Sequence, residues 1–334
     1  MDSKPLLTIA IPTYNGGNTI QNLLDLLLPQ CSDEIEVIIS DNCSTDGTDM
    51  IIKKYKEKSC KIIYNRNDRN IGPDANFLKC MRMAKGDFTW LVSDDDIVTE
   101  DSVGNIISFL KKNKNVCLVY LTTRDFRGKY NGINECMCHK PEAEIDICTN
   151  DKEEFMKYAG YYWGFMSSFI CNTSKFNEIP NPEIYYGTFW LQSYIHALCT
   201  LGNEIHLGVI KYPCVGAGIY VNTANYDSAL VNGVYYKKLI DFMVKNAYFD
   251  EKQLNDLYIR RLCLLSRHDI IKEKAAGIKK INKKTLFKCT FKYFRAWITL
   301  YPVILIPKFM CSIGLRLYRN KKGLEGKVRI NRPE

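Results

Sequence analysis

The chain has 334 residues, of which 46% are hydrophobic and 25% charged, and its formal net charge is +9. This composition excludes an intrinsically disordered chain and leaves room for a sizeable core in one large or two ordinary domains. The fourteen cysteines are scattered, without the paired spacing of a zinc site. Because residues 1–5 do not resemble a signal peptide, we expect free thiols in a reducing cytoplasm.

Two N-terminal segments have the pattern of an apolar strand that runs into a polar turn. The first is Leu6–Asn15 and the second is Ile35–Thr48, and leucines at helical spacing predict a helix from Thr19 to Leu28. Nearly continuous apolar strands that alternate with helices are typical of a parallel sheet buried on both sides. The sequence therefore predicts a Rossmann-like α/β fold with a mostly parallel sheet and helices on both faces.

Three adjacent carboxylates, Asp94, Asp95 and Asp96, follow a third apolar segment that begins at Trp90. Three anions at the rim of a core repel one another and lose hydration, so we expect a divalent cation or a strongly polar ligand among them. The alternative is an acidic N-cap for the helix that would begin near Ile97. From this segment alone, the two interpretations have equal weight.

The polar turns after these apolar segments are expected at one edge of the sheet, because the carboxyl ends of parallel strands lie on the same side. Ligands of open α/β sheets bind at this edge. Hydroxyl, amide and carboxylate groups would then line one crevice, which favours the metal-dependent site over the N-cap.

Five short motifs in the first hundred residues carry a family resemblance. In chain order they are Ile11–Asn15, Ser40–Thr48, Asn70–Asn76, Ala84–Asp87 and Asp94–Asp96. Their order and spacing resemble the GT-A fold nucleotide-sugar glycosyltransferases, similar to glycosyltransferase family two, that build bacterial surface polysaccharides. Within this group the chain looks most like the abequosyltransferases of O-antigen assembly, through segments 70–78, 93–96, 163–170 and 187–196.

The resemblance implies a donor site built from the first motifs and the acidic cluster. Asp41 would accept a hydrogen bond from the base or the ribose, although a turn residue that caps the next helix is the alternative. Asn70 and Gly72 would bring the backbone near the nucleotide, or else belong to an ordinary loop before an amphipathic helix. The residues implied in donor binding are Pro12, Thr13, Tyr14, Asn15, Asp41, Asn70, Gly72, Asn76, Lys85, Asp94 and Asp95.

The DxD element of the family can be matched in two registers. In one, Ser93 replaces the first acid and Asp95 is the second; in the other, the acids are Asp94 and Asp96. We favour Asp94 and Asp96 as the metal ligands and place Asp95 and Asp96 in the catalytic set. The expected ion is Mn2+ or Mg2+, because hard oxygen ligands suit both and either can neutralise the charge of a departing diphosphate.

Inverting members of the family carry a carboxylate base in a Glu-Asp pair, and the equivalent place in this chain, Gly187–Trp190, has no acid. Without a positioned base, an acceptor hydroxyl is not easily deprotonated for backside attack. We therefore favour a retaining reaction, in which the departing phosphate takes the proton. Asp46, Glu183 and His196 remain as bases that would permit inversion.

Aromatic residues are dense between Tyr161 and Trp190. Because sugars stack on aromatic faces, this cluster predicts a sugar-binding surface, and core packing is the alternative for about half of it. A histidine at helical spacing, such as His196, is also more often a core residue than a catalyst. The residues placed here are Trp163, Ser167, Ser168 and Trp190 for sugar binding, and Gln192 and His196 for catalysis.

The C-terminal part is expected to be helical from about Asn232, and its end is strongly basic. Residues 272–334 contain 17 Lys and Arg against three Glu, interleaved with aromatic and aliphatic residues. Such a tract suits an anionic membrane surface, but segment 296–306 is too short to span a bilayer. We predict a peripheral anchor on the inner face of the cytoplasmic membrane; the alternative is a helical extension that packs on its own domain or on another subunit.

Together these features predict a GT-A domain over residues 1–215 and a mostly helical, basic region over residues 216–334. The expected reaction moves abequose from its CDP form to a mannose of a lipid-linked O-antigen oligosaccharide. The alternatives are a transferase of this fold that uses a UDP- or dTDP-linked sugar and, from another class, a polyanion-binding protein. The expected partners are the nucleotide sugar, the lipid-linked acceptor and the membrane surface; no nucleic acid is expected, and a homo-oligomer stays open.

Overall fold

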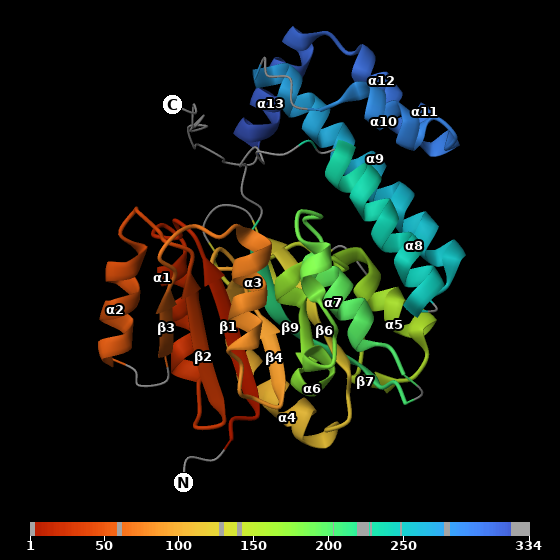
Figure 1. Cartoon of the computed structure of the whole chain (residues 1–334). Helices are drawn as coiled ribbons and strands as arrows, with labels where there is room; N and C mark the ends of the chain where they lie inside the picture. Colours follow the sequence, from red (N-terminus) through yellow and green to blue (C-terminus); the bar gives the residue numbers. More distant parts are fainter. Residues whose placement is uncertain are drawn as a thin grey trace. The chain divides into compact units, whose positions relative to one another are not determined.

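The computed structural model describes residues 4–58, 62–126, 130–138, 142–202, 204–218, 227, 229–247, 249–276 and 281–321. The chain divides into two compact units, residues 1–219 and residues 220–334. The first unit is a sheet covered by helices and the second is helical, as Figure 1 shows. The mostly helical character predicted for the C-terminal region is confirmed.

One sheet runs through the N-terminal unit. Its described strands are β1 (Leu7–Thr13), β2 (Ile35–Asp41), β3 (Ile62–Arg66), β4 (Phe88–Leu91), β5 (Ile97–Val98), β6 (Leu118–Phe126), β7 (Ile147–Thr149), β8 (Phe169–Asn172) and β9 (Leu207–Gly218). Their order in space is β3-β2-β1-β4-β8-β6-β9-β5, with β7 also paired to β9. The strands β1 to β4 are mutually parallel, as are β6 and β9, whereas β8 runs antiparallel between β4 and β6.

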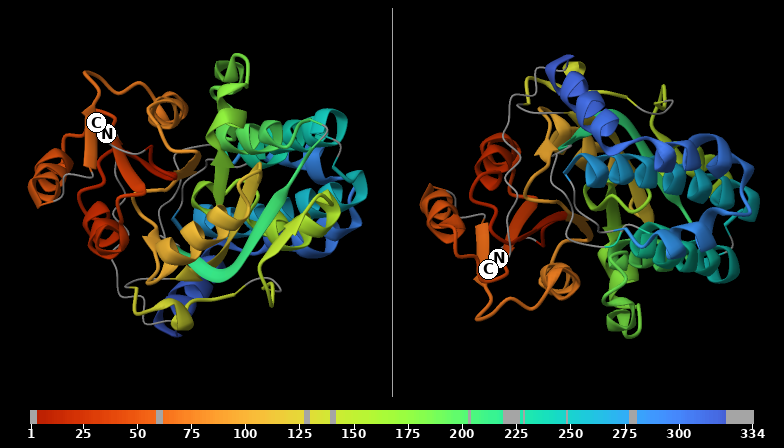
Figure 2. Two further views of the ribbon diagram at one scale, coloured as in Figure 1. Left: turned by 90° about the horizontal axis from the view of Figure 1, so that it is seen from below. Right: turned by 90° about the horizontal axis from the view of Figure 1, so that it is seen from above.

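Helices cover both faces of this sheet, as predicted. The described helices of the unit are α1 (Ile20–Leu27), α2 (Thr48–Lys58), α3 (Pro73–Arg82), α4 (Ser102–Lys112), α5 (Lys152–Ala159), α6 (Thr173–Asn177) and α7 (Leu191–Cys199). In Figure 2, α3 and α7 lie on one face, and α1 and α4 lie on the other. The leucines of α1 face the core: Leu23, Leu24 and Leu27 are fully buried.

The two helical layers explain why the strands are apolar at nearly every position. All of β1 is buried, and Ile9, Ile11, Val37 and Trp90 are each 0% exposed within one core cluster. Burying each such aliphatic side chain contributes about 1.5–3 kcal/mol of transfer free energy. This burial fixes the register of the parallel strands, and so it fixes which residues lie at their ends.

The carboxyl ends of β1, β2 and β3 are level with one another. Thr13 is the register partner of Asp41, and Asp41 is the partner of Arg66. β4 is shorter, and its last residue, Leu91, is paired with Ala10. The residues after Leu91 therefore run beside the end of β1.

The described part of the C-terminal unit begins with a π-helical turn at Ala229–Tyr235. It continues with α8 (Tyr236–Ala247), α9 (Glu251–Ala276), α10 (Lys283–Thr290), α11 (Phe294–Thr299), α12 (Tyr301–Leu305) and α13 (Lys308–Lys321). Apolar residues at helical spacing form its core, including the buried Leu239, Met243, Leu254 and Leu262. Their spacing agrees with the helical character predicted from about Asn232 onward.

Candidate active site

The loops that follow β1 and β4 meet at the carboxyl edge of the sheet. The amide of Val92 donates to the carbonyl of Ala10 at 2.9 Å, which carries the pairing of β4 one residue further. Beyond it, the Thr13 hydroxyl donates to the Asp94 carboxylate. A Cβ at Gly16 would overlap both Asp94 and the Thr13 hydroxyl. Glycine at position 16 therefore lets the first loop pass close to the acidic cluster without displacing these side chains.

The three aspartates of the cluster lie in different environments. Asp96 is 2% exposed and accepts hydrogen bonds at both oxygens, from the Ser167 hydroxyl at 2.6 Å and from the Gly218 amide at 3.1 Å. Asp94 and Asp95 are only partly buried, and Asp95 accepts from the Ser93 hydroxyl at 2.5 Å. Of the three carboxylates, Asp94 and Asp95 are thus available to a ligand. The expected pair of Asp94 and Asp96 does not agree with this arrangement, because the strand β9 covers Asp96.

Burial and crowding raise the pKa of two of these carboxyl groups, Asp94 and Asp96. Burial raises the pKa of Asp94 to about 7, and the charge of Asp95 adds to the rise. Burial and then the charge of Asp95 raise the pKa of Asp96 well above its ordinary value. A bound cation would relieve this repulsion.

The donor set fits Mn2+ or Mg2+ on chemical grounds, since it offers hard carboxylate oxygens. Within the described ranges, no group of three or more His, Cys, Asp and Glu side chains is arranged to hold a metal ion. Mg2+ in phosphate-transfer sites is commonly bound by one or two carboxylates, and water and substrate phosphates complete its shell. Asp94 and Asp95 match that type of site.

Ser167 connects the acidic cluster to the middle of the sheet. Besides donating to Asp96, its hydroxyl accepts from the Ser93 amide at 2.9 Å, and its carbonyl accepts from the Trp90 indole at 2.8 Å. Ser168 shares a hydroxyl hydrogen bond of 2.8 Å with Thr123. Both serines are 0% exposed. The expectation that they bind sugar hydroxyls does not agree with this burial; Ser167 instead positions the cluster, and Ser168 holds Thr123.

On the donor side, Asp41 is fully buried at the end of β2. One oxygen accepts from the amide and the hydroxyl of Ser44, at 2.8 and 2.6 Å. The other accepts from the Tyr64 hydroxyl at 2.9 Å and lies 3.4 Å from Nε of Arg66. Burial and the Asp41 carboxylate raise the pKa of Tyr64. Asp41 thus orders the turn after β2, and a nucleotide would reach it only if Tyr64 or Arg66 moved.

Amide side chains hold the loops after β2 and β3 together. Asn42 donates to the side-chain oxygen of Asn70 at 2.8 Å and to the carbonyl of Gly72 at 3.3 Å. Gly72 has a φ of +86° directly before α3, a conformation that glycine adopts without strain. Asn76 is buried and exchanges two hydrogen bonds with Ser40. Asn70 and Gly72 therefore lie at the edge of the sheet, and Asn76 supports them from inside.

The remaining donor-site candidates separate into near and distant residues. Tyr14 is 50% exposed at the carboxyl edge of the sheet. The amide of the next residue, Asn15, donates to the Ser44 hydroxyl at 2.9 Å. Pro12 is buried within β1. Lys85 precedes β4, and its amide donates to the Glu36 carboxylate at the opposite edge of the sheet. The implied role of Lys85 in donor binding does not agree with this position, because the two ends of a parallel strand lie at opposite edges of the sheet.

Three candidates from the aromatic region pack in the core. Trp163, Trp190 and His196 are 1%, 5% and 2% exposed. The His196 ring lies 4.7 Å from the ring of Phe169, and burial lowers its pKa to about 3. His196 is therefore neutral near pH 7 and has no access to a ligand. The sugar-stacking role expected of both tryptophans and the catalytic role expected of His196 disagree with this burial, whereas the core-packing alternative agrees with it.

Gln192 is also buried, at 8% exposure, and its side chain donates to the carbonyl of Gly164 at 2.9 Å. The aromatic rings of this region that reach the surface are instead Tyr186 and Phe189, at 39% and 45% exposure. Exposure of single aromatic residues cannot be recognised from composition. Phe189 has a positive φ of +62°, at the point where the chain turns just before α7.

Asp74 is a site residue that sequence reasoning missed. It lies in the first turn of α3, is 8% exposed, and accepts the amide of Gly187 at 2.7 Å. Burial raises its pKa. It therefore places a carboxylate against segment 187–190, which has none of its own. The available signal was the order Gly72-Pro73-Asp74, since proline and an acid commonly open a helix.

Two of the alternative bases are occupied by structural contacts. Glu183 is paired with Arg82 at 2.6 Å. Asp46 accepts the Thr48 amide at 3.2 Å at the start of α2, and its other oxygen accepts the Gly17 amide at 3.0 Å. Within the described residues, neither carboxylate forms a hydrogen bond with segment 187–190.

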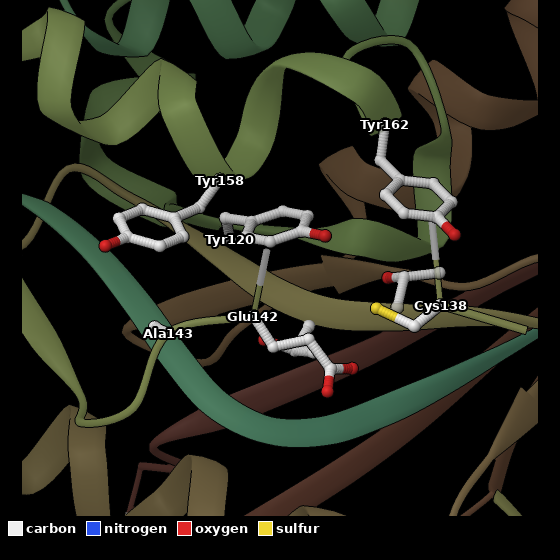
Figure 3. A pocket seen from close by; sticks show the side chains of 8 residues that line it. Tyr120, Cys138, Glu142, Ala143, Tyr158 and Tyr162 are labelled. Atoms are coloured by element: carbon white, nitrogen blue, oxygen red, sulfur yellow. The ribbon is translucent and has the colours of Figure 1, made fainter. Parts of the chain in front are cut away.

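A small pocket lies between β6 and the side chains of Cys138, Glu142, Ala143, Tyr158 and Tyr162. Figure 3 shows the rings of Tyr120, Tyr158 and Tyr162 around it, with Glu142 on the opposite side. The Tyr162 hydroxyl donates to Asp125 at 3.0 Å. Thr123 also lines the pocket. Its hydroxyl is hydrogen-bonded to that of Ser168, the residue after Ser167.

Comparison with known proteins agrees with this geometry. Residues 8–171 match the family described as Glycosyl transferase family 2. The chain is 28% identical over 274 residues to abequosyltransferase RfbV of Salmonella typhimurium, which covers 78% of this chain and 77% of that protein. It is 29% identical over 140 residues to a putative teichuronic acid biosynthesis glycosyltransferase, TuaG of Bacillus subtilis, covering 42% of this chain and 55% of that one.

Solved structures share the fold at low sequence identity. The structure of S. aureus TarS 1-349 in complex with UDP-GlcNAc superposes with a TM-score of 0.62 at 15% identity, covering 96% of this chain and 93% of that chain. The mannosyltransferase PcManGT from Pyrobaculum calidifontis, in complex with GDP-Man and Mn2+, gives a TM-score of 0.51 at 14% identity, covering 95% and 88%. The predicted GT-A fold is confirmed.

Proposed function

We infer that this chain, whose residues 8–171 form a glycosyl transferase family 2 domain, transfers a sugar from a nucleotide donor during synthesis of a surface polysaccharide. One observation carries this proposal. Thr13, Asp41 and the cluster Asp94–Asp96 follow three neighbouring parallel strands and meet at their carboxyl edge, where α/β sheets bind nucleotides.

Abequose from CDP-abequose is the donor that the RfbV likeness supports best, over about three quarters of both chains. A donor base would lie near Tyr14 and Asn70, which are exposed at the loops after β1 and β3. A UDP-sugar is the second candidate, favoured by the fold shared with a protein solved in complex with UDP-GlcNAc.

Asp94 and Asp95 are the residues that would hold Mn2+ or Mg2+. When bound, the ion supplies positive charge that stabilises the diphosphate leaving group. The protein would hold both carboxylates in place at the carboxyl edge of the sheet. Thr13 holds Asp94, Ser93 holds Asp95, and Ser167 anchors Asp96 between them and the sheet.

A retaining reaction is the stereochemical outcome we propose, because segment 187–190 has no acid and His196 is buried and neutral. In front-face transfer, the oxygen of the leaving phosphate takes the proton from the acceptor hydroxyl, and no enzyme base is required. Asp74 would then hold the Gly187 backbone in place and orient the loop that carries Tyr186 and Phe189. These exposed rings are suited to stacking against a mannose of a lipid-linked acceptor.

A donor panel tests the proposal. Hydrolysis of CDP-abequose and of UDP-, dTDP- and GDP-sugars would be measured with and without Mn2+, and we expect CDP-abequose with Mn2+ to react fastest. Asp94→Asn and Asp95→Asn should each lower turnover by about a hundredfold or more while circular dichroism stays unchanged. Equal turnover in excess chelator would refute the metal assignment, and no turnover of any nucleotide sugar would refute the function.

A further inference from the structure

The helices α10 to α13 expose large apolar side chains. Phe294, Leu305 and Phe309 are 77%, 83% and 64% exposed. In α11 and α13 the exposed residues recur three or four positions apart, as in Phe294, Trp297 and Ile298 or in Phe309, Ile313 and Leu317, so each of these two helices presents an apolar stripe to its surroundings. The exposed apolar set is Phe287, Phe291, Phe294, Trp297, Ile298, Leu305, Phe309, Met310, Ile313 and Leu317.

This set is not needed for the core of the unit. The same helices bury other residues, including Leu286, Ala296, Leu300, Val303 and Cys311. A helix on the surface of a water-soluble domain has one apolar face and one polar face. Here the described helices have an apolar side that is already packed and a second one that is exposed, and a surface of this kind marks an interaction site.

The charge around the exposed apolar set identifies the partner. From residue 274 to residue 324 the sequence contains no Asp or Glu. Lys284, Lys288, Lys292, Arg295 and Lys308 are all exposed on these helices. A partner must therefore combine apolar volume with dense negative charge, and a bilayer that contains anionic lipids has both.

The helix lengths fit an interfacial position. Within the described residues, no single helix is long and apolar enough to cross a bilayer. The segments Phe294–Leu305 and Lys308–Gly314 together reach that length and composition, but they are bent against each other by 102°. A bent pair of short helices is suited to lying in the headgroup boundary, with apolar side chains pointing toward the acyl chains.

Backbone carbonyls at the bend between these helices have a hydrogen-bond partner within the chain. At the end of α12, Nζ of Lys274 donates to the carbonyls of Val303 and Ile306, at 3.1 and 2.6 Å, and to that of Ile304. Carbonyls at a helix end have no partner within the helix, and leaving them unpaired in lipid is costly. One lysine thus satisfies the group of carbonyls that a shallow insertion would otherwise deprive of water.

We propose that α10 to α13 form a monotopic membrane anchor that inserts the exposed apolar set into the interface of an anionic bilayer, with the surrounding lysines and arginines on the lipid phosphates. The anchor is independent of which sugar the N-terminal unit transfers. A second copy of this chain is the competing occupant of the same surface.

Vesicle sedimentation of the full-length protein tests the anchor. The probes are vesicles of pure phosphatidylcholine and vesicles with about 30% phosphatidylglycerol, at about 0.1 and 0.5 M NaCl. The first variant is Phe294→Glu with Leu305→Glu, both at highly exposed positions. Its matched control is Met50→Glu with Ile145→Glu, which are 69% and 68% exposed in the N-terminal unit. Hydrolysis of the soluble donor and circular dichroism report folding of every variant.

We expect the wild type and the control to bind the anionic vesicles, and the Phe294 and Leu305 variant to bind at least tenfold more weakly. Lys288→Glu with Lys292→Glu should weaken binding by about 25-fold or more at low salt, because each basic residue contributes about fivefold, and by much less at high salt. Background sedimentation of the wild type would overturn the proposal. So would a wild-type dimer in light scattering that becomes monomeric in the Phe294 and Leu305 variant while vesicle binding does not change.

Discussion

Replacing Ser167 by alanine is the sharpest test of how the acidic cluster is held. The substitution removes one hydroxyl that donates to Asp96 at 2.6 Å and accepts from the Ser93 amide at 2.9 Å. Both partners lose a hydrogen bond at a position from which water is excluded, since Ser167 is 0% and Asp96 is 2% exposed. The variant therefore leaves a buried carboxyl group and a backbone amide short of partners.

The magnitude follows from the two bonds. A hydrogen bond to a full charge contributes about 1.5–3 kcal/mol and a neutral one about 0.5–1.5 kcal/mol. Together, loss of the two bonds should lower the free energy of unfolding of Ser167→Ala by about 2–4 kcal/mol.

The matched control is Ser168→Ala, the same substitution at the next residue, which is also 0% exposed. It removes only the hydroxyl pair with Thr123, so we expect a loss of about 1 kcal/mol. Urea denaturation followed by tryptophan fluorescence measures both values, and donor turnover at saturating donor should fall about tenfold or more in Ser167→Ala alone, since a small displacement of reacting groups is costly. A loss no larger than that of Ser168→Ala, with full turnover, would refute the role assigned to Ser167.

Three further outcomes are expected. Asp41→Ala should mainly weaken donor affinity, measured by calorimetric titration with the free nucleotide, because Asp41 holds Ser44, whose hydroxyl accepts from the Asn15 amide in the donor-site loop. Contacts of that loop with the nucleotide are made equally in ground and transition states, so a fall in turnover at saturating donor with unchanged affinity would contradict this. Asp74→Asn keeps an acceptor for the Gly187 amide and should retain turnover within about fivefold, whereas Asp74→Ala should lose more; a loss of more than a hundredfold in Asp74→Asn alone would identify Asp74 as a base and favour inversion. Burial lowers the pKa of His196 from 6.5 to about 3 in the folded state. As the pH falls below about 6.5, the unfolded chain therefore binds a proton at His196 that the folded chain does not bind, and the free energy of unfolding decreases. Between pH 7 and pH 5 this loss is about 2 kcal/mol, and a His196→Leu variant with the same pH dependence of unfolding as the wild type would show the reasoning to be wrong.

The sequence alone was enough to predict the fold and the edge at which the site lies. Continuous apolar runs such as Leu7–Thr13 that alternate with helical patterns are typical of parallel strands buried on both sides, and parallel strands bring their carboxyl ends together. The polar residues at and after the ends of those runs, from Thr13 to Asp94, are therefore predicted at one edge of the sheet. The antiparallel insertion of β8 between β4 and β6 had no such signal, because it depends on pairing with residues about eighty positions away in β4 and about fifty positions away in β6.

Only the tertiary structure decided which polar and aromatic residues face the crevice. The sequence alone does not distinguish Asp94, Asp95 and Asp96 from one another. In the fold, Ser167 and Gly218, which are distant in sequence, hydrogen-bond to Asp96 and bury it, whereas Asp94 and Asp95 are only partly buried. Trp163 and His196 share the chemistry of sugar-binding residues, yet they are packed in the core, while Phe189 is exposed. Burial is a sum over neighbours that are far apart along the chain. A local pattern specifies the chemistry that a side chain can offer, and the fold determines whether a ligand can reach it.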